Sequence, residues 1–196
     1  MMGSLISLPK PNRDGAMSLE QAITLRRSRR HFLPKPLTLE QIGQLTWVAQ
    51  GQDAGGRYRT TPSAGATYPL ELFVITDKGM FRYLPDKHSL EKLTDRDLRF
   101  PLATAAWGQD FIQAAPLTLL FAAEFTRTTG HYGKRGIRYV YMEAGHAAQN
   151  VHLQAEALGL GSVAIGAFDD NSVSEVLSLP RNLEPLYMVT VGYYRQ

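Results

Sequence analysis

The stretch 135–159 limits the fold most, because its apolar residues recur at alternating spacings of four and three, as on one face of a long α-helix. Side chains on this face are mostly small, and small side chains let a neighbouring backbone approach closely. We therefore expect this helix, the longest of the chain, in the centre of the fold or of a dimer. The apolar positions are Ile137, Tyr141, Ala144, Ala148, Val151, Ala155 and Leu158.

Two shorter helices are indicated near the N-terminus. Each begins with a Ser or Thr followed three residues later by Gln, a spacing that satisfies two free backbone donors at a helix start. The first helix is expected from Ser18 to about Ser28, and the second from Thr38 to a stop at Gly51. The segment 52–66 is rich in Gly, Arg and Thr and has no periodicity, which predicts a long ordered loop of the kind that binds a ligand.

Strands and one short helix account for most of the remaining chain. The β-branched and aromatic segments 70–76 and 80–84 flank a turn at 77–79 and predict an antiparallel hairpin. Strands separated by helices, with one hairpin among them, favour an α+β sandwich with a mixed sheet. The further expected elements are strands at 117–125, 161–168 and 186–194 and a capped helix at 170–178.

Length and composition narrow the class of protein. The 196 residues fit one domain, at 16–196, preceded by an N-terminal arm at 1–15. No cysteine is present, so thiolate and disulfide chemistry is excluded and redox chemistry requires a bound cofactor. A net charge of +3 does not by itself indicate nucleic acid. The N-terminus lacks a secretory signal, and the apolar stretches 111–123 and 157–168 are too short to cross a membrane, so we expect a cytoplasmic protein.

A basic cluster occupies residues 26–32, whose sequence is RRSRRHF. Each guanidinium group offers a planar fork of donors that suits the oxygens of a phosphate. The alternative is a solvated basic helix end, because cations stabilise a helix C-terminus. The cluster alone does not decide between a phosphate site and a solvated end.

Two further segments expose their backbone. Residues 62–69, PSAGATYP, place small side chains between two prolines, so that backbone groups can meet the polar edge of a flat ring; a tight turn into the hairpin is the simpler explanation. Residues 159–168, GLGSVAIGAF, match a dinucleotide pattern, but they close a helix and enter a strand, which is the reverse of that motif. Gly166 and Ala167 instead offer two unobstructed amides after the strand, or merely a crowded crossing.

Metal and hydrolase chemistry find little support. His146 and Asn150 lie one helical turn apart and His152 lies on another face, but no carboxylate completes a metal triad, so a structural role is favoured and no metal is expected. The patterns G-x-S-x-G, H-E-x-x-H and G-x-x-x-x-G-K-[ST] are absent from the sequence. Serine hydrolase, zincin and P-loop functions are therefore not indicated.

Taken in order, these segments resemble the FMN-dependent nitroreductase superfamily, and most closely its SagB/ThcOx-type dehydrogenase branch. The resemblance covers nearly the whole chain and rests on the segments 26–32, 62–71, 143–150 (EAGHAAQN) and 159–168. It implies a nitroreductase-like α/β/α sandwich with a mixed, largely antiparallel central sheet. It also implies a homodimer with the long central helix at the interface and two FMN molecules, each in contact with both subunits.

The resemblance further implies which residues form the site. FMN would pass hydride between NAD(P)H and a small organic substrate, the two using one open pocket in turn. The basic cluster would hold the phosphate and ribityl chain, the loop 62–68 would come from the partner subunit, and an amide near flavin N5 would stabilise the reduced ring. The implied cofactor-binding residues are Arg26, Arg27, Ser28, Arg30, Pro62, Ser63, Ala64, Gly65, Tyr68, Ile165, Gly166, Ala167 and Arg195.

The sequence departs from the family pattern at three places. Ala66 stands where many nitroreductases carry Asn, and Gly166 where they carry an acidic residue. Arg195 is the one basic residue after the final strand, so phosphate binding depends mainly on the N-terminal cluster. His131 and Tyr132 replace the Lys-Tyr pair of azoline-oxidising members, which argues against azole formation; because histidine titrates near neutrality, the two remain the candidate catalytic pair.

Two other functions stay open at this point. A basic module could bind nucleic acid or an acidic partner through residues 26–30, Arg57 and Arg59, and that binding would weaken steeply with salt. A flavin-fold protein could also bind or scaffold without turnover. Hydride transfer from NADH or NADPH to a bound flavin, followed by reoxidation with a quinone or nitroaromatic, distinguishes an enzyme from such a scaffold.

Overall fold

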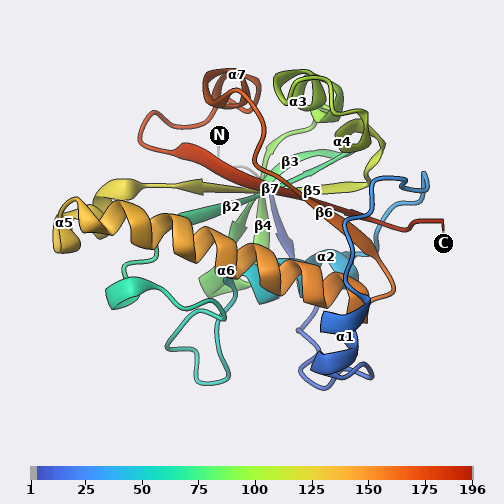
Figure 1. The fold of residues 1–196 in the computed structure, drawn as a ribbon, viewed down its shortest axis with the longest axis horizontal. Helices are drawn as coiled ribbons and strands as arrows, with labels where there is room; N and C mark the ends of the chain where they lie inside the picture. The colour runs from blue at the N-terminus through green and yellow to red at the C-terminus, as the bar shows by residue number, and fades with distance from the viewer. Residues whose placement is uncertain (1–3, 196) are drawn as a thin grey trace.

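A computed structural model describes residues 4–195. In this part of the chain seven strands form one sheet in the order β1-β4-β3-β2-β5-β7-β6, with helices on both faces (Figure 1). The strands are β1 (Leu5–Ser7), β2 (Leu70–Thr76), β3 (Gly79–Leu84), β4 (Ser89–Thr94), β5 (Leu117–Ala123), β6 (Gly161–Ile165) and β7 (Glu184–Gly192). The helices are α1 (Leu19–Leu25), α2 (Leu39–Gln50), α3 (Arg99–Ala105), α4 (Asp110–Ala114), α5 (Phe125–Tyr132), α6 (Arg135–Ala157) and α7 (Asp170–Val176), with short 3₁₀ turns η1 (Ala64–Ala66) and η2 (Pro85–Lys87).

All six pairings between neighbouring strands of this sheet are antiparallel. Within residues 4–195 parallel pairing is confined to one isolated bridge, between Ser28 and Ser162. The expected α/β/α sandwich with a largely antiparallel sheet is confirmed, but the sheet is not mixed, because none of its neighbouring strands within residues 4–195 is parallel.

The strand alternation builds two cores, one on each face of the sheet. On β5, Leu119 and Phe121 face the layer that contains α2 and α6, whereas Leu120 and Ala122 face the layer of α3, α4 and α7. All four side chains are fully buried. Period-two alternation with both faces covered explains why β5 reads as an uninterrupted apolar run in the sequence.

Helix α6 crosses one face of the sheet along its whole length (Figure 1), as the stripe of small residues predicted. Ala144, Ala148 and Ala155 are buried there, but Ile137 and Tyr141 are not: their side chains are 42% and 56% exposed. At this end the helix face is not covered by the chain's own sheet, so the prediction of a central position in the fold holds for the buried part of the helix, and the dimer alternative stays a prediction for Ile137 and Tyr141.

The ends of several elements differ from the prediction. Helix α1 stops at Leu25 rather than near Ser28, because Arg26 leaves the helical backbone with ψ 124°. The predicted strand 161–168 ends at Ile165. Phe125, expected at the end of β5, begins α5 instead. Sequence periodicity also missed β1, β4, α3, α4 and α5, which are all shorter than nine residues.

The N-terminal segment is partly built into the sheet. Of the expected arm 1–15, residues 1–3 lie outside the described part of the chain, as does Gln196 at the other end. Residues Leu5–Ser7 form β1 and pair with β4, and Leu8 is buried in the core on the α6 side.

Candidate functional site

The basic cluster lies beside strand β6. After α1 the chain is extended, and the Arg29 amide donates to the carbonyl of Ser162 at 2.9 Å, next to the bridge between Ser28 and Ser162. Arg27 Nη1 donates to the carbonyls of Thr24 and Arg26 at 3.2 and 3.0 Å. The segment therefore runs along the sheet edge and is not the helix end that the sequence suggested.

Arg29 differs from the other arginines of the cluster because its side chain is built into the fold. Its Nε lies 4.0 Å from Oε1 of Glu156, which is 5% exposed, and its guanidinium group stacks 4.1 Å from the centre of the Tyr194 ring. Arg29 is the one ion-pair partner of this buried carboxylate within residues 4–195, although neither of the two facing atoms forms a hydrogen bond. Arg29 thus fixes the segment to the C-terminal part of α6.

The other three arginines are not neutralised. In residues 4–195, Arg26, Arg27 and Arg30 form no ion pair with a carboxylate. Arg30 extends over the ring of Phe111, at 5.8 Å from its centre. Three unpaired guanidinium groups on one short segment are suited to an anion with several oxygens.

His152 of α6 lies close enough to Arg26 for the charge of that arginine to act on its imidazole ring. Its Nδ1 is 2.8 Å from Ser162 Oγ, and the ring is 8% exposed. Burial, together with the smaller effect of the positive charge of Arg26, lowers the pKa of His152 to about 4. The imidazole is therefore neutral at pH 7 and acts as a hydrogen-bonding residue, in line with the structural role expected from sequence.

The predicted backbone surface follows directly at the end of β6. Ile165 is buried, while Gly166 and Ala167 are exposed. The side-chain amide of Gln109 donates to the carbonyl of Ala167 at 2.8 Å, which ties this corner to the turn between α3 and α4. The basic cluster and residues 165–167 therefore lie along the same strand, on one side of the molecule. Arg195, also exposed, follows the Tyr194 on which Arg29 stacks.

The loop 62–68 has a strained backbone. Gly65, Ala66 and Tyr68 have positive φ angles of 60°, 52° and 47°, and only glycine adopts such angles without cost. The Tyr68 amide donates to Ser63 Oγ at 3.0 Å. Strain of this kind persists only where the surroundings hold it in place, and it is concentrated at functional sites.

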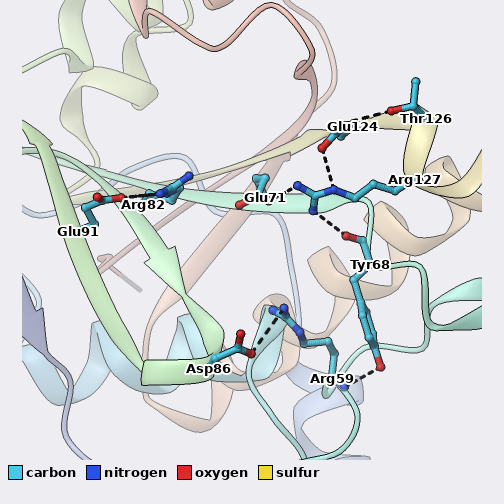
Figure 2. Close-up of polar contacts among 9 residues, drawn as sticks. All are labelled: Arg59, Tyr68, Glu71, Arg82, Asp86, Glu91, Glu124, Thr126 and Arg127. Carbon is cyan, nitrogen blue, oxygen red and sulfur yellow. Dashed lines mark hydrogen bonds and ion pairs between the residues drawn. The ribbon is translucent and has the colours of Figure 1, made fainter. Parts of the chain in front are cut away.

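Arg127 of α5 supplies much of that support (Figure 2). Its guanidinium group donates to the Tyr68 carbonyl at 3.0 Å, to Glu71 at 2.8 Å and to Glu124 at 2.7 Å. One planar fork thus joins the loop, strand β2 and helix α5. Arg59 adds a second contact, since its guanidinium group lies 5.1 Å from the centre of the Tyr68 ring.

The candidate catalytic pair lies next to this loop. The Tyr132 hydroxyl is 2.8 Å from the position that a Cβ on Gly65 would occupy, so a side chain there is excluded. The His131 and Tyr132 rings meet edge to face at 4.5 Å, with His131 exposed and Tyr132 half-buried. The structure therefore places the pair beside the loop, a proximity that neither motif predicted on its own.

Sequence reasoning missed Glu143 of α6. This carboxyl is 3% exposed, and burial raises its pKa to about 7, against the opposing effects of a Ser63 hydrogen bond and the charge of Arg59. An acidic residue directly before Ala144 of the apolar stripe was the available signal. Its contact with the loop 62–68 was not visible in the sequence.

Within residues 4–195 no hydrogen bond or ion pair joins the loop 62–68 to the basic cluster. Ser63 of the loop acts on the pKa of Glu143, and Thr61, just before the loop, accepts from Asn150 of α6 at 3.3 Å. The basic cluster acts on the same helix at His152 and Glu156. Glu156 lies thirteen residues beyond Glu143, which corresponds to about 20 Å.

A comparison with known protein families shows to which family this chain belongs. The sequence profile described as the nitroreductase family matches residues 23–193. The chain belongs to the nitroreductase family. The resemblance to the nitroreductase superfamily and the expected enzyme class, an oxidoreductase of this family, are confirmed.

Individual relatives match between 88% and 98% of the nitroreductase. A nitroreductase-type protein of Methanocaldococcus jannaschii is 41% identical over 197 residues, which cover 97% of this chain and 98% of the relative. The FMN reductase [NAD(P)H] of Bacillus subtilis is 27% identical over 187 residues, covering 88% of this chain and 64% of that protein. A nitroreductase-type crystal structure from Ralstonia eutropha JMP134 superposes with a TM-score of 0.88 at 34% identity, covering 98% and 90% of the two chains.

Two other features bear on the class of site. None of the helices described here combines the length and apolar composition needed to cross a bilayer. Across residues 4–195, no group of three or more His, Cys, Asp or Glu side chains is arranged to hold a metal ion.

The lowered pKa of His152 predicts that stability falls in acid. Between about pH 6.5 and about pH 4 the unfolded chain binds a proton on this histidine and the folded chain does not, so the free energy of unfolding decreases as pH falls. We expect His152→Gln to remove about 2 kcal/mol of the loss between about pH 7.5 and about pH 5, measured by urea unfolding. The exposed His31→Gln should leave the loss intact. An unchanged pH dependence in His152→Gln would refute the assignment.

Proposed function

We propose that this nitroreductase is an FMN-dependent oxidoreductase that transfers hydride between NAD(P)H and a small organic substrate, the two using one site in turn. The observation that carries the proposal is the set of three unpaired arginines lying along the same strand as the exposed backbone of Gly166 and Ala167. The named activity of the Bacillus subtilis relative supports both FMN and NAD(P)H.

The residues present suit the parts of FMN. Arg26, Arg27, Ser28 and Arg30 offer guanidinium and hydroxyl donors for the phosphate and ribityl chain, with Arg195 on the same side. Ile165 is buried in the core and anchors the end of β6, so the exposed Gly166 and Ala167 are the residues that offer amides for the polar edge of the ring. The Tyr187 ring lies 3.5 Å from the position of a Cβ on Gly166, so it packs behind this corner and supports it.

We further propose a homodimer in which the loop 62–68 of one subunit completes the site of the other. Residues Ile137, Tyr141 and Met142 of α6 are 42%, 56% and 53% exposed. About one turn farther along the helix, a Cβ on Gly145 would meet nothing within 4 Å, so the face is open there too. A two-fold axis beside this face would bring the loop of one chain toward the basic cluster of the other, which closes the separation of about 20 Å along α6.

When bound, FMN supplies a two-electron hydride acceptor and donor. The chain's own residues would bind and orient it: the amides of Gly166 and Ala167 could donate to the polar edge of the ring, and the partner's loop, with Pro62, Ser63, Ala64, Gly65 and Tyr68, would cover it. His131 and Tyr132 can hold or move a proton at an imidazole nitrogen or a phenol oxygen. We keep the SagB/ThcOx branch as part of the proposal, with His131 in place of the lysine of azoline-oxidising members.

The alternative of a nucleic-acid module has less support. Arg59, one of its required side chains, is used within the fold: it donates to the carbonyl of Gln50 at 3.0 Å and stacks on Tyr68. It therefore does not form one free basic surface with residues 26–30.

The function is tested on the purified chain mixed with FMN. We expect binding, bleaching of the flavin absorbance by NADH or NADPH without oxygen, and its return on addition of a quinone or nitroaromatic. A chain that binds FMN but is not reduced would favour the scaffold alternative. A chain that binds no FMN would overturn the proposal.

Removing one arginine of the cluster should weaken FMN binding. Arg26→Ala deletes a charge-assisted contact worth about 1.5–3 kcal/mol, so we expect the dissociation constant to rise by about tenfold to a hundredfold in a fluorescence titration. Arg96→Ala, which removes the same charge from an exposed position after β4, serves as the control and should change little. Equal affinities for Arg26→Ala and the wild type would contradict the phosphate assignment.

Charging the exposed face of α6 should separate the subunits. Met142→Asp places a carboxylate in the proposed interface, and we expect a monomeric mass by light scattering together with loss of FMN binding. Leu93→Asp changes a side chain of similar exposure, 47%, on β4 and should leave the mass as in the wild type. A Met142→Asp protein that keeps the wild-type mass would argue against this face as the interface.

A further inference from the structure

The turn between α3 and α4 carries an aromatic side chain that the proposed chemistry leaves unused. Trp107 is 71% exposed, more than any other large apolar side chain in residues 4–195. Tryptophan is highly buried on average, and where it does lie at a surface it is enriched among the residues that contribute most to binding. An indole ring left this open to solvent therefore calls for a reason other than the core.

The backbone at this turn is strained. Trp107 has a φ of 57° and the following Gly108 a φ of 74°. The Gly108 amide donates to the Ala103 carbonyl at 2.9 Å and the Trp107 amide to the Thr104 carbonyl at 3.1 Å, the two bonds of a Schellman helix end. In that arrangement the position of Trp107 favours glycine, because a side chain is crowded at positive φ. The tryptophan is therefore kept at a cost in stability.

Hydrogen bonds fix this turn beside the strand corner of the proposed site. The Gln109 side chain donates to the Ala167 carbonyl at 2.8 Å, and the Asp169 amide donates to the Ala105 carbonyl at 3.0 Å. Both ends of the turn are thus attached to the segment that follows β6. Trp107 lies two residues from Gln109, so the Cα atoms of these two residues are within about 7 Å of each other.

The basic cluster contacts the same segment. The Arg30 guanidinium group lies 5.8 Å from the centre of the Phe111 ring, and Phe111 is the second residue of α4. Figure 1 shows α3 and α4 side by side on the face of the sheet opposite α6. Residues 109–111 therefore contact both the arginine segment and the Gly166–Ala167 corner, and Trp107 directly precedes them.

We propose that Trp107 is a substrate-binding residue, on whose indole ring a planar aromatic electron acceptor of the quinone type stacks beside the flavin. This rests on the proposed function and adds the class of its substrate. The indole is already exposed and its backbone is held at both ends of the turn, so little freedom is lost when a flat ring stacks on it. The quinone takes a hydride from the reduced flavin, which is oxidised, and a proton from water, and it leaves as the hydroquinone.

The first test measures the oxidative half-reaction alone. The full-length protein, loaded with FMN and reduced by one equivalent of dithionite without oxygen, is mixed with menadione, a planar uncharged quinone, in a stopped-flow instrument. Trp107→Ala should raise the half-saturating menadione concentration by about tenfold, because an aromatic contact is lost. Trp107→Phe keeps a ring and should restore most of the difference. Ferricyanide, an octahedral ion that cannot stack, should reoxidise the wild type and Trp107→Ala at equal rates.

The second test needs no flavin. Because the backbone at position 107 suits glycine, Trp107→Gly should raise the Tm of the chain without FMN by about 2–4 °C, although it weakens menadione binding as Trp107→Ala does. The matched control is Phe100→Ala. It removes an aromatic side chain that is 63% exposed from the regular part of α3, and it should leave both the Tm and the half-saturating concentration close to the wild type.

The outcomes separate this inference from the proposed function. A wild type that binds no FMN overturns the proposed function, and the role of Trp107 with it. A wild type that menadione reoxidises, with a half-saturating concentration that Trp107→Ala does not change, overturns the role of Trp107 alone. Equal slowing with ferricyanide, or a lower Tm in Trp107→Gly, would show that the indole serves the fold and would overturn it too. A change of mass by light scattering in place of a change in half-saturation would assign Trp107 to a protein contact, with the same consequence.

Discussion

The packing of α6 on the sheet is the constraint on which the rest of this structure depends. Alanines at 144, 147, 148 and 155 let the helix lie close over the strands, and Val140 and Val151 fill the space between them. Close packing of this kind leaves no room for adjustment, so the position of α6 fixes the position of every segment attached to it. Both halves of the candidate site are attached in this way, the loop near the middle of the helix and the basic cluster near its end.

Three ionisable side chains interrupt the buried face of α6, and each one meets a segment that carries site residues. Ser63 of the loop 62–68 acts on the pKa of Glu143, His152 meets β6 close to Arg26, and Glu156 meets Arg29. Apolar residues at these positions would stabilise the core more. Polar contacts are directional, however, and the positions of a strained loop and of an extended arginine segment depend more on directional contacts than on burial of apolar side chains. We infer that stability is given up along this helix in return for the placement of its neighbours.

The elements predicted correctly from the sequence are those determined by interactions between residues close together in the chain. The hairpin of β2 and β3, the two capping boxes and the central helix follow from turn chemistry, paired side chains and periodicity over many residues. Short elements such as β4 and α4 carry too few residues for a period to emerge, and tertiary contacts decide them. The positive φ of Ala66 and Tyr68 could not be predicted either, because alanine and tyrosine do not favour that region and only their surroundings impose it. Likewise the four arginines look equivalent in sequence, yet Arg29 is set apart by a buried carboxylate 127 residues away in the chain.

Dividing a cofactor site between subunits has an energetic consequence. In the proposed dimer, neither subunit alone presents both the phosphate-binding arginines and the loop that covers the ring, so the ligand binds the dimer far better than the monomer. Mass action then requires FMN to stabilise the dimer, and dilution of the protein to release FMN. The apolar area exposed on α6 need not sustain association by itself, since part of the free energy comes from the bound nucleotide. A face with only a few exposed apolar side chains, such as Ile137, Tyr141 and Met142, is consistent with a dimer whose association is stabilised partly by bound FMN.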